Sequence, residues 1–166
     1  MKQVGDHLSV WALSQSDDAV KDVFGRSAFN RYYYSAFLVT REMLAGFDSK
    51  WKKAKHSSIP DLLTGSIKKQ IKKKLISNVE KGLMTESEKW KLLASLSSST
   101  AELSNLLRNA YSLRCVADYE PEELITCEDE VIKLQNENLT SAKMWPGKAN
   151  SCCKVIRRVW KEAGFG

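Results

Sequence analysis

Two stretches of the sequence concentrate residue types that could bind a phosphate ester and act on it. The first, Arg26–Phe37, contains two arginines and three consecutive tyrosines. The second, Arg108–Tyr119, contains two arginines with five residues between them, and an aspartate four positions after the second arginine. Arginine presents a planar fork of donors that matches a phosphate group. The sequence contains no phosphate-binding glycine loop, nucleophile elbow or pair of metal-ligating histidines, so we expect neither a cofactor nor a metal.

The second stretch falls on a predicted helix whose polar and apolar residues lie on different faces. At about 100° per residue, Arg108, Tyr111 and Asp118 project away from the apolar seam, together with Ser104 and Cys115. The seam residues recur every three or four positions and are Leu92, Leu96, Ser99, Leu103, Leu106, Ala110, Leu113 and Ala117. We therefore expect the polar face to line a cleft or an interface.

Simpler structural roles compete for several of these residues. Arg114 and Asp118 are spaced i,i+4, which also fits a plain ion pair at the end of a helix. Tyr33 and Tyr34 are more typical of core aromatic residues than of a site. Arg31 lies beside them on the same predicted helix, and it needs a partner or an opening to solvent because an unpaired buried charge is unfavourable.

A lysine-rich segment separates the two stretches. Nine lysines lie between Lys50 and Lys74, against a single acidic residue, Asp61. Such a run favours binding to a polyanion through the release of counterions, although lysines that merely solvate a helix face give the same pattern. A later segment, Asp118–Glu137, is acidic and suits the docking of a partner. Our candidates for contacts with RNA are Lys52, Lys53, Lys68, Lys69, Lys72 and Lys73.

Helix signals dominate the chain, and they predict an all-α fold without strands. Ser16 is the expected cap of a long second helix, and Thr85 with Glu88 forms a capping box before the fourth helix. The segment Trp145–Gly147 predicts a break between the last two helices. The predicted helices span residues 4–13, 16–47, 58 onward, 85–121, 122–144 and 149–163.

Composition places the chain among globular proteins with a single domain over residues 1–166. Hydrophobic residues make up 43% of the 166 residues and charged residues 28%, which is close to the average. No apolar window reaches the length of a membrane span, so we expect a cytoplasmic protein without a membrane partner. The four cysteines lack a CxxC pair and predict buried or free thiols rather than a zinc site, with a bond between chains at Cys152 and Cys153 as the alternative.

Taken together, the motifs resemble the HEPN family (higher eukaryotes and prokaryotes nucleotide-binding), in its compact prokaryotic branch. The resemblance covers residues 16–156. In that branch the second helix carries an Arg-x-Tyr-Tyr-small-x-Phe stretch, a histidine opens the loop before the third helix, and an Arg-x-x-Ala-Asp-Tyr motif lies near the fourth helix. With one residue of slack in the first motif, the matching residues here are Arg31, Tyr33, Tyr34, Ser35, Phe37, His56, Arg114, Ala117, Asp118 and Tyr119.

The resemblance implies a HEPN-like bundle of four to five main helices, a homodimer, and a cleft between protomers that holds the polar residues. In nuclease members an arginine followed by a polar residue precedes a histidine by four to six positions. Arg108 and Asn109 match the first half of that motif, but Arg114 stands where the histidine is expected. A guanidinium stays protonated and cannot act as a base at neutral pH. Either the nuclease chemistry is lost, or His56 or Tyr119 takes over the missing role.

Two functions from different classes follow from this resemblance. The first is a toxin-like or defence-associated protein that acts on RNA, with a metal-independent endoribonuclease as its catalytic form. The second is a non-catalytic accessory subunit that binds a minimal nucleotidyltransferase partner or a nucleotide. A plain helical nucleotide-binding or scaffold module is a third interpretation.

Overall fold

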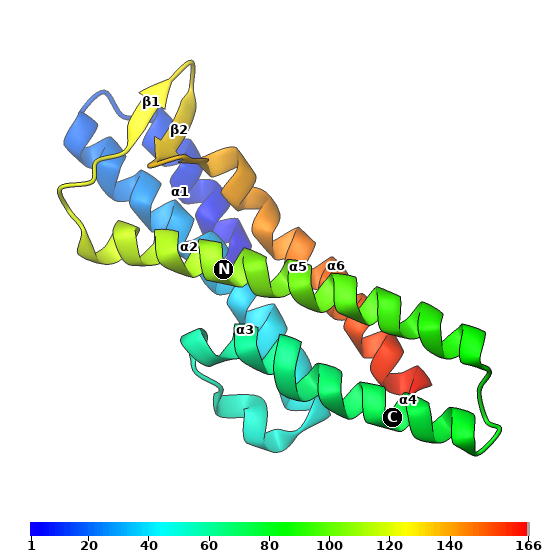
Figure 1. Cartoon of the computed structure of the whole chain (residues 1–166). Coiled ribbons are helices and arrows are strands. Elements are labelled where there is room, and N and C mark those ends of the chain that lie inside the picture. Colours follow the sequence, from blue (N-terminus) through cyan, green and yellow to red (C-terminus); the bar gives the residue numbers. More distant parts are fainter. Residues whose placement is uncertain (166) are drawn as a thin grey trace. The chain divides into compact units, whose positions relative to one another are not determined.

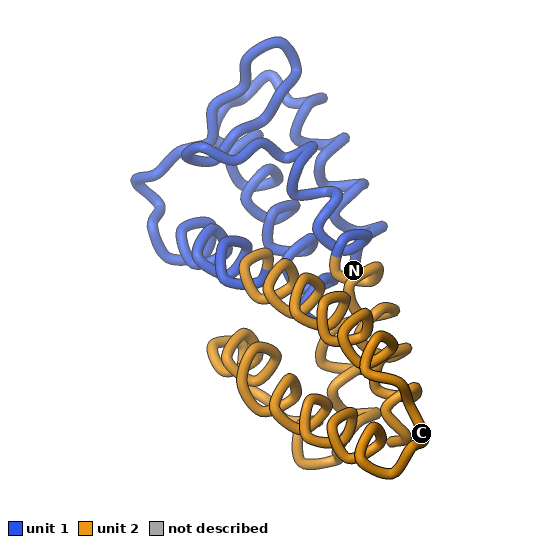
Figure 2. Tube along the Cα trace, turned by 45° about the vertical axis from the view of Figure 1, so that its right-hand side comes forward, with its two compact units in different colours: residues 1–38, 107–148 blue, residues 39–106, 149–166 orange. Residues whose placement is uncertain are grey.

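The computed structural model describes residues 1–165. Within them the chain is mostly helical, with one small antiparallel sheet (Figure 1). The predicted predominance of helices is therefore confirmed, whereas the prediction that the fold has no strands is wrong. The chain forms two compact units (Figure 2): unit 1 comprises Met1–Leu38 and Leu107–Lys148, and unit 2 comprises Val39–Leu106 and Ala149–Gly166. A single HEPN-like domain over residues 1–166 stays a prediction.

Three long helices contribute residues to both units. They are α2 (Asp18–Phe47), α5 (Glu86–Tyr119) and α6 (Leu139–Glu162). The cap of α2 is Asp17 rather than the predicted Ser16, because its Oδ1 atom accepts the amide hydrogens of Ala19 at 2.8 Å and Val20 at 3.3 Å. These are the second and third residues of the helix, whose amides lack partners inside it.

The core of unit 1 is aromatic. Phe29, Tyr32 and Tyr33 of α2 are fully or almost fully buried, and the Phe29 ring lies 6.4 Å from that of Trp145 in α6. Helix α1 (Lys2–Ser14) packs closely at Gly5, where an added Cβ would lie 2.7 Å from the Tyr32 ring. The α5 side of this core consists of buried aliphatic residues: Leu107, Ala110, Leu113, Val116 and Ala117.

Residues 126–138 form a sheet, so the predicted helix over residues 122–144 is wrong in its first part. The strands are β1 (Thr126–Glu128), β2 (Val131–Leu134) and β3 (Glu137–Asn138), paired antiparallel in that order. Asp129 and Glu130 join β1 to β2 with φ values of 48° and 61°. Two left-handed residues match the twist of a tight hairpin, but this loop lacks the usual Asn-Gly signature.

Helix α6 continues through the predicted break at Trp145–Gly147. Pro146 lies inside the helix, where its missing N–H typically costs about 3 kcal/mol. Apolar residues recur at helical spacing on both sides of it and are buried, which offsets that cost. Those residues are Leu139, Ala142 and Trp145 in unit 1 and Ala149, Cys152, Cys153, Ile156, Val159 and Trp160 in unit 2.

The third predicted helix is a composite that belongs to unit 2. It comprises α3 (Ile59–Leu62), the π-helical turn η3 (Leu63–Ile67) and α4 (Lys68–Glu80). Residues spaced by exactly four positions shift by about 40° around an α-helix from one to the next, because one turn takes 3.6 residues. A π turn contains more residues than an α turn, so it reduces that shift. Every member of the stripe is 0% exposed: Ile59, Leu63, Ile67, Ile71 and Leu75.

The predicted capping box at the start of α5 is confirmed. The Glu88 carboxylate accepts the Thr85 amide hydrogen at 2.8 Å, and the Thr85 hydroxyl accepts that of Glu88 at 3.2 Å. Two short 3-10 helices, η1 (Ser49–Lys53) and η2 (His56–Ser58), complete unit 2 before α3. No helix within residues 1–165 is long and apolar enough to cross a membrane.

Candidate functional site

Arg114 and Asp118 form an ion pair near the end of α5 in unit 1. Arg114 Nη2 lies 2.6 Å from Asp118 Oδ2, and Asn30 Nδ2 of α2 donates to Asp118 Oδ1 at 2.6 Å. Tyr34 of α2 and Tyr119 of α5 flank the guanidinium. We call these five residues the Arg114 cluster. The i,i+4 ion pair that the sequence left as an alternative is therefore present.

The guanidinium of Arg114 is largely committed within this cluster. Its Cζ atom lies 5.1 Å from the ring centroid of Tyr119 and 5.8 Å from that of Tyr34, and its terminal nitrogens make long contacts of 3.4 and 3.5 Å to the two hydroxyls. Burial by itself lowers the pKa of Arg114. The hydrogen bond to Tyr119 and the charge of Asp118 raise that pKa, and the net shift is upward. Arg114 therefore stays charged, and a phosphate would compete with Asp118 for it.

Two atoms of the Arg114 cluster have unmet hydrogen-bonding capacity. Within residues 1–165, Arg114 Nε and Asn30 Oδ1 are buried without a hydrogen-bond partner, and each such group typically costs about 1–3 kcal/mol. Unsatisfied buried groups call for an explanation, such as a water molecule or a ligand that completes them. We therefore treat the Arg114 cluster as a candidate site.

Behind the Arg114 cluster lies a group of packed tyrosines. Tyr33 is 1% exposed, and its ring lies 5.5 Å from that of Tyr34 and 5.8 Å from that of Tyr111. Burial raises the pKa of Tyr33 well above its usual range, and the neighbouring Tyr111 adds to this. Tyr33 is thus a core aromatic residue that keeps its proton at neutral pH. Arg31, on the same helix, is half-buried.

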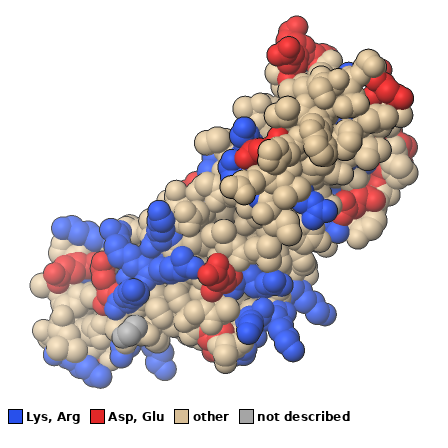
Figure 3. Space-filling model, turned by 180° about the vertical axis from the view of Figure 1, so that it is seen from behind, with Lys and Arg blue, Asp and Glu red and all other residues tan. Residues whose placement is uncertain are grey.

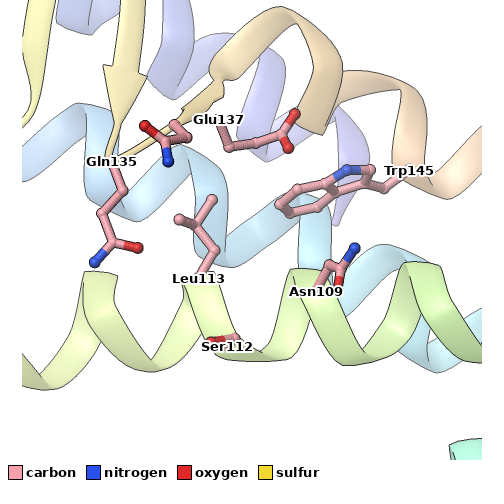
Figure 4. A pocket seen from close by; sticks show the side chains of 7 residues that line it. Asn109, Ser112, Leu113, Gln135, Glu137 and Trp145 are labelled. Atoms are coloured by element: carbon pink, nitrogen blue, oxygen red, sulfur yellow. The ribbon is translucent and has the colours of Figure 1, made fainter.

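Arg108 and Asn109 lie on the exposed side of α5. Asn109 borders a pocket of about 270 Å³ in unit 1, with Trp145 of α6 beside it (Figure 4). Glu137 is the charged group of its lining, so the pocket repels a phosphate rather than binding it. The opposite wall is the turn from β2 to β3, which lies in the segment predicted to be helical, so the pocket was not predicted. The lining is Asn109, Ser112, Leu113, Gln135, Asn136, Glu137 and Trp145.

The predicted catalytic residues do not all belong to the same unit. Arg108, Asn109, Arg114 and Tyr119 are in unit 1, whereas His56 is half-buried in η2 of unit 2. The second histidine of the sequence, His7, is exposed on α1 in unit 1. Within residues 1–165 no group of three or more His, Cys, Asp or Glu is placed to hold a metal ion.

Sequence reasoning also misplaced one residue and missed another. Ser104, predicted on the polar face of α5, is 3% exposed and donates to the Pro60 carbonyl at 3.3 Å. Asn30 was not singled out, although it contacts Asp118 in the Arg114 cluster. Its spacing of four residues before Tyr34 was the available signal, since the two side chains share a helix face.

Five of the six lysines predicted to contact RNA are exposed on unit 2. Lys68 differs, because it is half-buried and its Nζ donates to Ser97 Oγ at 2.8 Å. The buried stripe of α4 fixes the direction of its exposed lysines, since residues on the opposite face must project into solvent. We call the exposed set the basic surface: Lys52 and Lys53 of η1, and Lys69, Lys72 and Lys73 of α4.

The net charge is unevenly divided between the two units. Unit 2 contains 17 Lys and Arg against 8 Asp and Glu, a net charge of +9, and unit 1 contains 9 against 12, a net charge of −3, which together give the +6 of the chain. Lys and Arg side chains form several groups on the face shown in Figure 3. A unit with this excess of positive charge attracts polyanions at long range.

No protein-family model, curated protein or solved structure matches the chain. The resemblance to the HEPN family therefore rests on the motifs of the sequence.

Proposed function

We propose that the protein binds RNA through the basic surface of unit 2. The observation that carries this proposal is the exposure of all five lysines. For the three on α4, the burial of the apolar stripe of that helix enforces the outward direction. Lysines in such an arrangement can approach several phosphates and release the counterions condensed on them. The excess of +9 on this unit supports the same partner.

The wider role proposed from the motif resemblance is that of a HEPN-type protein, toxin-like or defence-associated, that acts on RNA. Homodimerisation belongs to the same proposal and can be measured by light scattering. A second candidate is the non-catalytic accessory subunit of a nucleotidyltransferase. The presence of Arg114 at this position favours this second role, because its guanidinium stays protonated beside Asp118 and cannot act as a base.

Fluorescence anisotropy with a labelled single-stranded RNA of about 20 nucleotides tests the proposal. We expect binding that weakens steeply between about 50 and about 200 mM salt, with a slope of log K against log salt near −0.7 for each phosphate contacted. A single-stranded DNA of the same sequence shows whether the 2′-hydroxyl matters. Absence of binding at low salt, or binding that does not respond to salt, would contradict the proposal.

We expect RNA to be bound without being cleaved, because Arg114 occupies the position of the catalytic histidine in nuclease relatives. The check is incubation of end-labelled RNA in a metal chelator, followed by gel analysis. Cleavage that leaves 2′,3′-cyclic phosphate ends would contradict this expectation. To assign the cleavage to this protein, Arg108→Ala must reduce the rate by orders of magnitude, whereas the exposed control Arg158→Ala must not. His56→Ala would then decide whether His56 moves the proton.

A further inference from the structure

A groove of about 710 Å³ runs beside strand β1 in unit 1. One wall consists of α2 residues from Asp18 to Val23, and the other of residues Leu124–Glu128. We call it the β1 groove. Figure 1 shows β1 next to the first turns of α2, where the Ile125 amide donates to Asp22 Oδ1 at 2.9 Å. The groove and its walls lie entirely within unit 1.

Strand β1 offers an open backbone edge to this groove. The sheet order β1-β2-β3 makes β1 an outer strand within residues 1–165. Backbone groups alternate between the two edges of a strand, and the amide of Ile125 already points toward α2. Cys127 has the same parity as Ile125, so its N–H and C=O face the groove. An unprotected strand edge is a template for pairing with another chain.

The walls beside this edge expose large apolar side chains. Val23 is 61% exposed and Leu124 is 65% exposed, and both border the groove. Two such residues next to an unpaired strand favour aggregation in an isolated protein. An extended segment that covered them would gain from apolar burial as well as from backbone pairing.

The surroundings of the groove are strongly acidic. Residues 120–130 contain six Asp and Glu and no Lys or Arg. Asp18 and Glu128 border the groove itself, where Lys21 and Lys133 neutralise part of their charge. This balance favours an occupant that brings positive charge and disfavours an acidic one.

We propose that the β1 groove binds an extended segment of a partner protein with alternating apolar and basic residues, which adds to β1 as a fourth strand. Main-chain hydrogen bonds to Cys127 supply the pairing, Val23 and Leu124 contact the apolar side chains, and the acidic surroundings select the basic ones. This binding does not depend on RNA binding by unit 2.

The probe is a fluorescein-labelled Lys-Val-Lys-Val-Lys-Val peptide titrated into the full chain, with the Glu-Val repeat as its charge-reversed control. We expect the basic peptide to bind at least tenfold more tightly than the acidic one. N-methylation of the amides that face β1 should abolish binding, whereas N-methylation of the alternate set should not. Equal binding of the two charge variants, or equal effects of the two methylation patterns, would overturn the proposal.

A second arm uses the protein. Cys127→Pro removes the outward N–H at a position where an edge strand tolerates proline, and Cys127→Ser is the matched control. We expect tenfold weaker binding in the first variant alone. In the wild type, the peptide should also slow alkylation of the exposed Cys127. Cys152 and Cys153 should react slowly in this assay, because burial raises the pKa of both thiols to about 11. Self-association that Cys127→Pro prevents would overturn the proposal in favour of a second copy as the occupant.

Discussion

Replacing Arg26 by methionine is expected to lower the free energy of unfolding by about 3–5 kcal/mol. Arg26 is 9% exposed, and its Nε lies 2.8 Å from Asp22 Oδ2. Its terminal nitrogens donate to the carbonyls of Val116 at 3.1 Å and Ala117 at 3.0 Å. They also donate to the carbonyls of Glu120 and Glu123. The Val116 and Glu120 carbonyls also accept the amide hydrogens of Glu120 and Glu123, both at 3.1 Å. The Ala117 carbonyl cannot accept a helical hydrogen bond, because Pro121 four residues later has no N–H.

The loss is large because one side chain satisfies many groups. Methionine would leave the Asp22 carboxylate, whose side chain is 15% exposed, without its cation. It would also remove the side-chain donor from four carbonyls, of which those of Val116 and Glu120 keep a backbone donor. Arg26→Lys keeps the charge but not the fork of donors, so its effect should be intermediate. Denaturant unfolding followed by circular dichroism measures these differences.

The matched control for Arg26 is Arg158→Met. Arg158 also pairs with a carboxylate four residues away, Glu162, but the distance is 3.8 Å and the side chains are 60% and 47% exposed. Exposed pairs of this kind contribute at most about 0.5 kcal/mol. Hydrogen exchange gives a local measurement, since residues 116–125 should lose protection in Arg26→Met. A destabilisation below about 1 kcal/mol in that variant would contradict the role assigned to Arg26.

Replacing all five lysines of the basic surface by glutamine is expected to weaken RNA binding on the order of 100-fold at moderate salt. Each lysine that binds a phosphate contributes about 0.7 to the slope of log K against log salt, so the slope should become shallower by that amount for every such lysine replaced. Lys68 is left unchanged because it bonds to Ser97. The substituted residues are Lys52, Lys53, Lys69, Lys72 and Lys73.

The control for these lysines must lower the net charge of the protein without altering the basic surface. Glutamine at Lys69, Lys72 and Lys73 of unit 2 is compared with glutamine at three exposed lysines of unit 1, since both variants lower the net charge by three. If the two triple variants bind equally weakly, net charge alone drives binding and the basic surface has no special role. The unit 1 positions are Lys2, Lys143 and Lys148.

Much of the helical content follows from local sequence. Three predicted features depend only on neighbours within a few residues, and all three are present. They are the capping box of Thr85 and Glu88, the apolar stripe of α4 with its spacing of four residues, and the end of α5 before Pro121. Interactions at i,i+3 and i,i+4 are legible in a sequence because helix geometry is constant. The ion pair of Arg114 and Asp118 belongs to the same class.

The errors occur where contacts distant in sequence override local signals. Asp129 and Glu130 adopt left-handed backbone conformations because β1 and β2 pair across them, which residue type does not predict. Pro146 stays inside α6 because the residues around it are buried against other elements. In both cases the decisive interaction joins segments whose proximity is not visible in the local pattern.

For the candidate sites, the sequence determined which residues could do chemistry, and the tertiary structure decided what they face. Spacing on α5 placed Arg114 four residues before Asp118, but only packing against α2 brought Asn30 and Tyr34 to that pair. The role of Arg26 likewise became visible only when α2 met the end of α5. The periodicity of a sequence determines in which direction each side chain projects from its own helix. Which residue of another helix it contacts depends on how the side chains of the two helices pack together.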